Sequence, residues 1–319
     1  MNKSRYYPLH LAVLNNHLVN YFFVFDHQTK ISIFQDCVKV LLDFDARIDA
    51  FTSISTEKLT PLMLACQKGF LPIVKYLIEQ GAKVEGRDRF KRTPLIHACM
   101  YGNAHIVSYL LRLGANANVF DSSSNTALHY AIAYGWYFCV RLLIEAGANI
   151  NCRNCWQTTC LEAGFSKGHY GICDYLLTEH QADINFKTDD GLTLVMITVD
   201  LEISPSAVQQ LDYVVVKHKA DCTCADINGR NAFHYLALNQ STLTSNRLTE
   251  KEEKTLKKNV FRMARILFDH QCNPLQRDNK AQTSLMLALE SRNFLLVDFF
   301  INEAKLEINA DVSHDIILR

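Results

Sequence analysis

The apolar residues of this chain recur at helical spacing, and the helical segments themselves recur every 33 residues. The clearest examples are residues 73–78, 106–111 and 139–144, in which apolar positions lie three and four residues apart. That spacing predicts amphipathic helices that bury one face against their neighbours. A Gly-Ala pair follows each of them, and glycine can end a helix in the left-handed conformation without steric cost. The pattern therefore predicts a series of short helices of fixed period.

A second helical motif precedes each of these helices. The motif Thr-Pro-Leu-x-x-Ala-Cys begins at Thr60 and again at Thr93, and its phase continues through Thr126, Thr159 and, with one residue added, Thr193. Proline suits the first helical turn because its missing N–H would have no partner there. Four glycines at the same period are expected to end this helix: Gly69, Gly102, Gly135 and Gly168. Two helices per period predict a helical solenoid, whose repeats offer a binding surface and contain no chemistry of their own.

Eight units can be counted from the first residue of each motif. These residues are Tyr7, Thr60, Thr93, Thr126, Thr159, Thr193, Asn231 and Thr283. The motif and its period resemble those of the ankyrin-repeat family, closely in the second to fifth units and loosely elsewhere. The resemblance implies an all-α ankyrin-repeat solenoid of about eight helix-turn-helix units with short β-hairpin fingers, continuous over residues 1–319. It also implies non-covalent recognition of proteins through the finger tips and the concave helices.

Three segments depart from the repeat. Residues 241–258 are polar, and Thr249, followed by Glu and Lys, is expected to start a lengthened second helix. Residues 19–35 are aromatic and β-branched, and their removal restores the repeat phase, so they are either a translated intron or an insertion packed elsewhere. Residues 312–319 leave the pattern after Asp311, where a splice donor could be encoded, and are interpreted as a candidate non-native tail.

A narrower resemblance rests on two off-consensus stretches, residues 158–165 and residues 213–223. Both look like the ankyrin region of invertebrate tankyrase-like poly(ADP-ribose) polymerases. Those proteins carry their repeats upstream of a WGR module and a catalytic domain that transfers ADP-ribose from NAD. Nothing in this sequence matches that catalytic domain, so the resemblance supplies no catalytic residue. A reading frame that continues past Asp311 into a WGR module would indicate a truncated ADP-ribosyltransferase.

Composition limits the class of partner. The formal net charge is zero, from 33 Lys and Arg against 33 Asp and Glu, whereas duplex nucleic acid needs a basic footprint. No apolar run reaches the roughly 18 residues of a membrane span, and the first residues lead into repeat sequence without a signal peptide. Eleven cysteines, at repeat positions, indicate a reducing compartment. We expect an intracellular monomer, cytoplasmic or nuclear, that binds proteins and carries no cofactor.

Two groups of residues could be taken for chemical sites. The first is a set of four histidines expected to share one repeat position: His10, His97, His129 and His234. One histidine per unit at one offset favours local hydrogen bonds at the base of each finger over metal ligation or base catalysis. The second group has part of the spacing of a zinc site: Cys152, Cys155, Cys160 and His169. Because Cys160 replaces the helix-starting proline and the fourth ligand would lie across a helix, we expect no metal site.

Aromatic residues and two arginines supply the candidate binding surface. The expected contacts are Tyr101, Tyr134, Trp136, Phe90, Trp156, Arg87 and Arg89. Tyr101, Tyr134 and Trp136 flank the glycines that end two adjacent first helices, and Phe90 and Trp156 lie at finger tips. Aromatic side chains exposed at such positions suggest binding anchors. The alternative is that the rings pack against neighbouring fingers.

Positive charge gathers beside one of these finger-tip aromatics. Arg87, Arg89, Lys91 and Arg92 form a basic cluster around Phe90. The cluster indicates some acidic character in whatever binds there. We therefore expect a non-catalytic scaffold for partner proteins, with the targeting region of a truncated ADP-ribosyltransferase as the alternative.

Overall fold

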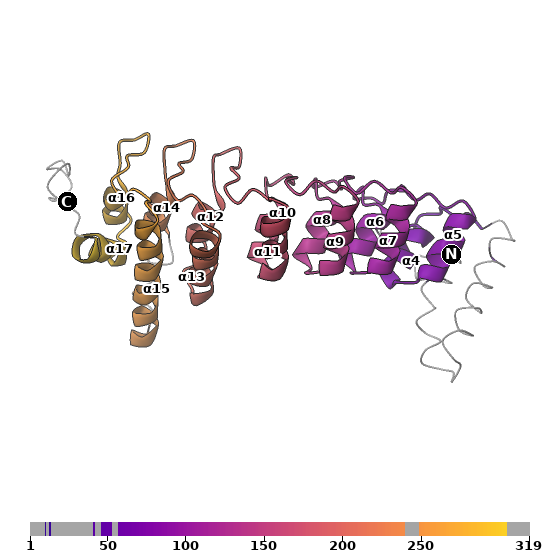
Figure 1. The fold of residues 1–319 in the computed structure, drawn as a ribbon, viewed down its shortest axis with the longest axis horizontal. Helices are drawn as coiled ribbons and strands as arrows, with labels where there is room; N and C mark the ends of the chain where they lie inside the picture. Colours follow the sequence, from indigo (N-terminus) through magenta and orange to yellow (C-terminus); the bar gives the residue numbers. More distant parts are fainter. Residues whose placement is uncertain are drawn as a thin grey trace. The chain divides into compact units, whose positions relative to one another are not determined.

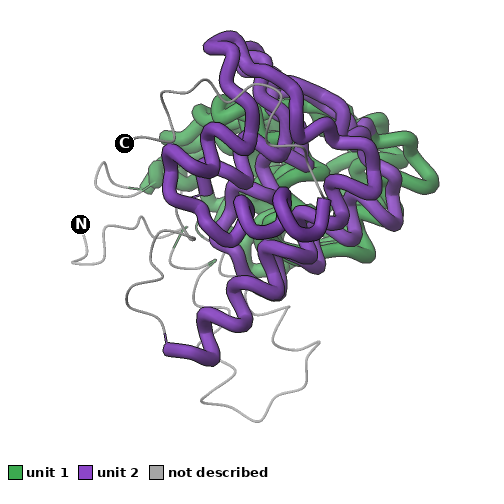
Figure 2. The backbone as a smooth tube through the Cα atoms, turned by 90° about the vertical axis from the view of Figure 1, so that its left-hand side faces the viewer, with its two compact units in different colours: residues 1–182 green, residues 183–319 purple. Residues whose placement is uncertain are grey.

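The computed structural model describes the following parts of the chain: residues 10, 13, 41, 46–52, 57–239 and 249–304. Within these parts every regular element is a helix, accompanied by single β-bridges. The chain divides into two compact units, residues 1–182 and residues 183–319 (Figure 2). The expectation of one continuous solenoid over residues 1–319 stays a prediction.

Four helix pairs make up the described part of the first unit (Figure 1). In chain order they are α4 (Pro61–Lys68) with α5 (Leu71–Glu79), α6 (Pro94–Met100) with α7 (Ala104–Arg112), α8 (Ala127–Ala133) with α9 (Tyr137–Glu145), and α10 (Cys160–Ser166) with α11 (Tyr170–Glu179). The first helices α4, α6, α8 and α10 pack in one row, and α5, α7 and α9 pack in a second row. The predicted all-α repeat fold is confirmed in this unit.

Three helix pairs make up the described part of the second unit. In chain order they are α12 (Leu194–Asp200) with α13 (Pro205–Leu211), α14 (Ala232–Leu238) with α15 (Glu250–Asp269), and α16 (Ser284–Glu290) with α17 (Phe294–Asp298). Helix α13 continues into the π-helix η1 (Asp212–Lys217), and α17 continues into η3 (Phe299–Glu303). The first helices again pack in one row and the second helices in another. Within the described ranges, no helix combines the length and apolar character that a bilayer crossing needs.

Threonine and glycine set the ends of the first helices, as the motif predicts. Thr60 caps α4, where its Oγ1 accepts the backbone N–H of Met63 at 3.2 Å. Thr93 and Thr193 accept the corresponding N–H groups of α6 and α12. The four predicted glycines lie in the left-handed region, with φ of 79°, 72°, 76° and 75° in chain order. Both ends of these helices are therefore determined locally.

The polar insertion of the seventh repeat lengthens a helix, as predicted. Thr249 and Glu252 form a capping box, in which the N–H of Thr249 donates to Glu252 Oε2 at 2.8 Å. Helix α15 then runs for 20 residues. Residues 240–248 lie outside the described residues, as do the segments 19–35 and 312–319. The interpretations of those last two segments stay predictions.

At the start of four of the described second helices, a side chain donates a hydrogen bond to the preceding repeat. Asn293 Nδ2 donates to the carbonyl oxygens of Leu236 at 3.0 Å and Ala237 at 3.5 Å, and its Oδ1 accepts the N–H of Leu296 at 3.2 Å. The same position supplies the donor in the first unit, through Asn103, Trp136 and His169. Carbonyl groups at the end of a helix have no partner within it. The next repeat therefore supplies hydrogen-bond donors to these carbonyl groups.

Asn293→Ala should lower the free energy of unfolding by about 2 kcal/mol, because it leaves buried backbone groups without a hydrogen-bond partner. Asn293 is fully buried, so water cannot replace the amide. Urea denaturation followed by circular dichroism measures the loss. Asn302→Ala, at an exposed position of the same unit, is the control and should stay within about 0.5 kcal/mol of the wild type. Equal effects of the two substitutions would contradict the role given to Asn293.

Candidate partner-binding site

Each finger, the loop that links one helix pair to the next, is a tight turn closed by a side chain at its base. Asp88 Oδ1 accepts the N–H groups of Phe90 and Arg92, both at 2.8 Å. Asp121 and Asn154 repeat this arrangement in the next two fingers. In the described fingers, β-pairing is limited to single bridges: Phe120–Thr126, Arg153–Thr159 and Arg277–Thr283. The expected β-hairpins are thus reduced, because a side-chain oxygen takes the N–H groups that a longer ladder would use.

Neighbouring finger tips within a unit are joined by backbone hydrogen bonds. In the first unit, Ser122 N–H donates to Phe90 O at 2.8 Å, and Cys155 N–H donates to Ser123 O at 2.9 Å. The second unit has the same link from Asn279 N–H to Asn228 O at 2.8 Å. The tips are therefore held at a fixed spacing, and a partner would meet a row of preorganised turns.

A buried carboxylate network supports the finger that carries Phe90. Asp88 Oδ2 accepts from Arg92 Nε at 2.7 Å and from His97 Nε2 at 3.1 Å, while Gln67 donates to His97 Nδ1 at 3.0 Å. Burial by itself raises the pKa of Asp88, but the hydrogen bonds from His97 and Arg92 outweigh it and hold that pKa below its ordinary value. Arg92, expected in the exposed basic cluster, is instead buried, and its guanidinium lies 4.9 Å from the centre of the Phe90 ring.

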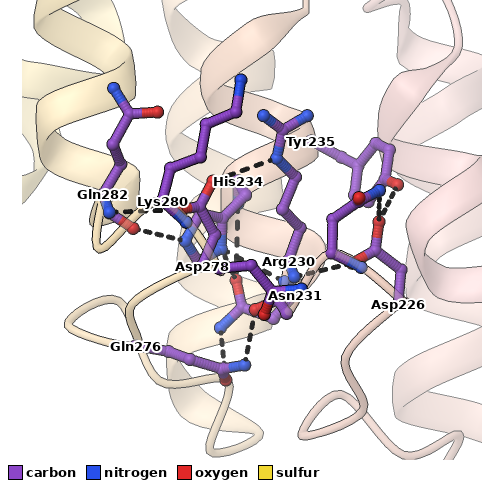
Figure 3. A network of polar contacts seen from close by, with 12 residues as sticks. Asp226, Arg230, Asn231, His234, Tyr235, Gln276, Asp278, Lys280 and Gln282 are labelled. Atoms are coloured by element: carbon purple, nitrogen blue, oxygen red, sulfur yellow. Dashed lines mark hydrogen bonds and ion pairs between the residues drawn. The ribbon is translucent and has the colours of Figure 1, made fainter.

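The second unit builds the same kind of network beneath its fingers (Figure 3). Asp226 accepts the N–H groups of Asn228 at 2.9 Å and Arg230 at 2.7 Å, and the hydroxyl of Tyr235 at 2.7 Å. Arg230 Nε lies 3.3 Å from the carboxylate of Asp278 in the next finger. Burial and the Asp226 carboxylate raise the pKa of Tyr235 above its ordinary range, so the hydroxyl remains a donor.

The four histidines do not share one position, which corrects the expectation. His129 and His234 lie three residues after the residue that caps their helix, and their Nδ1 atoms accept its backbone N–H at 3.1 Å. His97 lies four residues after its cap, and one further residue turns a helical side chain by about 100°. It therefore faces Asp88 instead of the cap. His10 Nε2 lies 2.9 Å from the backbone carbonyl oxygen of Leu59, at the start of the next repeat.

All seven residues expected to bind a partner are exposed. At the finger tips, Phe90 is 43% exposed and Trp156 is 68% exposed. Tyr101 and Tyr134 end α6 and α8 and are each 52% exposed, and Trp136 is 41% exposed. Arg87 and Arg89 are exposed beside Phe90. The structure thus places these side chains on the fingers and at the helix ends of the first unit.

Besides Phe90, whose ring lies against Arg92, two of the aromatic rings have partners within the protein. The ring of Tyr134 stacks on Tyr130 of its own helix, with centroids 6.5 Å apart and planes at 12°. The indole of Trp136 lies on Gly102, and its Nε1 donates to Met100 O at 3.3 Å. Trp136 is therefore exposed and also joins two neighbouring repeats of the first unit.

The sequence interpretation missed two further side chains on the fingers. Phe120 is 55% exposed, and Arg153 is exposed. Each directly precedes the residue that closes its finger, as Arg87 does. Because these three positions are 33 residues apart, the repeat period could have identified them.

The candidate zinc ligands are not brought together as a set. Cys155 is exposed at a finger tip, and His169 donates to the backbone carbonyl of Ala133 in the preceding repeat. Cys152 and Cys160 do meet, with their Sγ atoms 3.6 Å apart. Their neighbour is His129, which lies 23 residues before Cys152 and was assigned only a structural role.

The second helices present a different exposed face. Phe138 on α9 is 69% exposed and lies beside an open groove of about 480 Å³ between α7 and α9. His105 and Arg141 also line this groove. It lies on helices other than those that carry Tyr101 and Tyr134.

Comparisons with known proteins agree with this architecture. A model described as ankyrin repeats in three copies matches residues 1–88, 30–121, 84–154 and 113–188. The chain is 35% identical over 243 residues to the poly [ADP-ribose] polymerase tankyrase of Caenorhabditis elegans, a match that covers 74% of this chain and 10% of that protein. The chain therefore spans about a tenth of the length of the curated relative it matches.

A solved structure shows the same fold. It is the crystal structure of the ankyrin repeat domain of Bcl-3, a member of the IkappaB protein family, with a TM-score of 0.59 and 20% sequence identity. The likeness covers 76% of this chain and 99% of that domain. Ankyrin repeats typically mediate protein–protein interactions. With the family model covering residues 1–188, more than half of its length, the chain belongs to the ankyrin-repeat family.

Proposed function

We propose that the chain is a non-catalytic protein-binding module whose partner lies along the fingers and the ends of the first helices in the first unit. The observation that carries this proposal is the exposure of Phe90, Trp156, Tyr101 and Tyr134 on those elements. Large aromatic side chains make favourable anchors because they bury a large area at a small cost in conformational entropy. Backbone bonds between the finger tips support the proposal, since a preorganised surface loses less entropy on binding.

The charges beside Phe90 indicate the chemistry of the partner. Arg87 and Arg89 are exposed and make no ion pair with any residue that the structure describes. Lys91 is exposed beside them, whereas the acidic Asp88 is buried. A partner segment that combines acidic residues with an aromatic or apolar anchor would match this surface in charge and shape.

Selection from a randomised peptide library displayed on phage tests the proposal on the full chain. We expect the enriched peptides to carry acidic residues next to an aromatic or apolar residue. For a selected peptide, the Tyr101→Ala, Tyr134→Ala double variant should raise the Kd at least about tenfold, which corresponds to about 1.4 kcal/mol. Arg87→Glu with Arg89→Glu should raise it further at low salt than at high salt.

Phe138→Ala is the matched control, because Phe138 is more exposed than either tyrosine and lies on a second helix. It should leave the Kd unchanged. The proposal would be contradicted by peptides whose affinity falls with Phe138→Ala and survives the tyrosine double variant. That outcome would move the partner to the groove between α7 and α9.

A second candidate function is the targeting region of an ADP-ribosyltransferase. Its support is the 35% identity to the Caenorhabditis elegans tankyrase, named as a poly [ADP-ribose] polymerase. Sequencing of the full-length mature transcript tests it. A reading frame that continues into a WGR module and an ADP-ribosyltransferase domain would support it, and a mature transcript that encodes only these 319 residues would contradict it.

A further inference from the structure

Two cysteines face each other across the finger that carries Trp156. Cys152 precedes the finger and Cys160 is the first residue of α10. The antiparallel bridge between Arg153 and Thr159 places these cysteines directly opposite each other, and their Sγ atoms are 3.6 Å apart. Opposite residues in such a pair have Cα atoms about 4.5–5.5 Å apart, within the range that a disulfide spans.

The two thiols have different surroundings. Cys160 is fully buried, and Cys152 is partly exposed. The hydrogen bond from the Cys160 thiol outweighs burial and lowers the pKa of Cys152 to about 4. Burial raises the pKa of Cys160 well above its ordinary value. The pair therefore combines a partly exposed thiol of lowered pKa with a buried thiol behind it, as in dithiols that react with oxidants.

A metal site fits these residues less well. His129, Cys152 and Cys160 offer three ligand atoms within 4.8 Å of one another. However, Nδ1 of His129 already accepts the backbone N–H of Thr126 at 3.1 Å, the capping role that His234 fills in the second unit. A metal ion would have to break this bond. Without it, only two thiols remain, fewer than the ligands that a protein zinc site uses.

We propose that Cys152 and Cys160 form a redox site that a hydroperoxide converts into a disulfide. The Cys152 thiolate attacks a peroxide oxygen, the O–O bond breaks, and a sulfenic acid forms as hydroxide leaves; the proton that the Cys152 thiol released to solvent on ionising converts this hydroxide to water. The sulfur of Cys160, losing its proton, then attacks Cys152 Sγ and displaces the oxygen as water. In total the two thiols lose two electrons, and one hydrogen peroxide is reduced to two waters.

The disulfide would require only a small movement. The Sγ atoms must approach by about 1.5 Å to reach bonding distance. The bond would tie the base of the finger to the first turn of α10 and enclose residues 153–159 in a covalent loop. This modification does not depend on partner binding and can be measured without a partner.

Mass spectrometry of the reduced full chain, treated with hydrogen peroxide and then alkylated and digested with trypsin, tests the proposal. Trypsin cleaves after Arg153, so the disulfide should link peptide 142–153 to peptide 154–167, with the loss of two hydrogens. Because the second peptide also contains Cys155, the Cys155→Ser variant must keep the link. A link that disappears in Cys155→Ser, or uniform oxidation of all exposed cysteines, would overturn the assignment.

Two further variants separate the steps. Cys160→Ser, which keeps a hydroxyl donor beside Cys152, should abolish the link and leave a sulfenic acid at Cys152 that dimedone traps, whereas Cys152→Ser should give neither product. Both variants should keep the helical circular dichroism spectrum. Absence of the dimedone adduct in a folded Cys160→Ser variant would show that Cys152 is not the attacking thiol.

The pH dependence of alkylation gives an independent readout. Iodoacetamide should modify Cys152 at a nearly constant rate between about pH 5 and 7.5, because its thiolate is already formed there. A cysteine in a model peptide, with a pKa near 8.5, should instead react about tenfold faster per pH unit below pH 8. A tenfold rise per pH unit for Cys152 would overturn the proposal of a resident thiolate.

Discussion

Asp88→Ala should lower the free energy of unfolding by about 3 kcal/mol. The substitution removes the carboxylate that holds the buried guanidinium of Arg92 at 2.7 Å and accepts from His97 at 3.1 Å. Breaking a buried ion pair by removing one partner typically costs about 3–5 kcal/mol. The remaining contact of Arg92 with Glu57 at 2.9 Å places the loss at the lower end. Urea denaturation at neutral pH measures it.

A second background identifies the source of this loss. In an Arg92→Met chain, Asp88→Ala should cost only about 1–2 kcal/mol, for the two finger N–H groups that lose their acceptor. Glu79→Ala, at an exposed position of α5, is the control and should change stability by less than about 0.5 kcal/mol. An equal cost in both backgrounds would show that an unpaired guanidinium is not the main cause.

The same comparison has a pH dependence of defined sign. The pKa of Asp88 lies below its ordinary value in the folded chain, so its stabilising contribution is present above the unfolded pKa, near 3.9, and is lost as the pH falls through the folded pKa. The difference in unfolding free energy between wild type and Asp88→Ala should be constant from about pH 5 to 7 and shrink below about pH 4. A difference that grows on acidification would contradict the network.

The helix pairs could be predicted from the sequence because their determinants are local. Thr60 and Thr93 cap a helix within the same four residues, and Gly69 takes a conformation that other residues adopt only at a cost. The fingers were less predictable. A β-hairpin and a turn closed by an Asp or Asn side chain both place polar residues between the helix pairs. The two structures differ in which acceptor binds the N–H of Phe90, a backbone carbonyl or the Asp88 carboxylate.

The candidate site was predictable only where exposure follows from local geometry. Phe90 and Trp156 occupy the tips of tight turns, so both rings point away from the core. The contact of Trp136 with Gly102 joins residues of neighbouring repeats, and no short-range sequence motif predicts it. The orientation of His97 follows from its position one residue further along the helix than His129 and His234. A motif that allows histidine at either position does not distinguish the two orientations.

Gly102→Ala should lower the free energy of unfolding by about 3 kcal/mol. Gly102 has φ of +72°, which costs about 1–2 kcal/mol for a residue with a Cβ. An added Cβ would also lie 2.5 Å from Cδ2 of Trp136, and displacing a packed side chain costs about 1–3 kcal/mol. Gly114→Ala is the matched control, because Gly114 has φ of +86° with no atom within 4 Å of the added Cβ. It should cost only the conformational part.

Trp136→Ala separates the two contributions and bears on binding. In that background Gly102→Ala should cost no more than Gly114→Ala, which gives a coupling of about 2 kcal/mol between Gly102 and Trp136. A coupling of this size means that the indole lies on Gly102, at the end of α6 and next to Tyr101. Loss of partner affinity in Trp136→Ala could then arise from a displaced Tyr101 as well as from a lost contact, so the tyrosines are the better test of the binding surface. A coupling near zero would instead release Trp136 from its structural role and make it a direct candidate for partner contact.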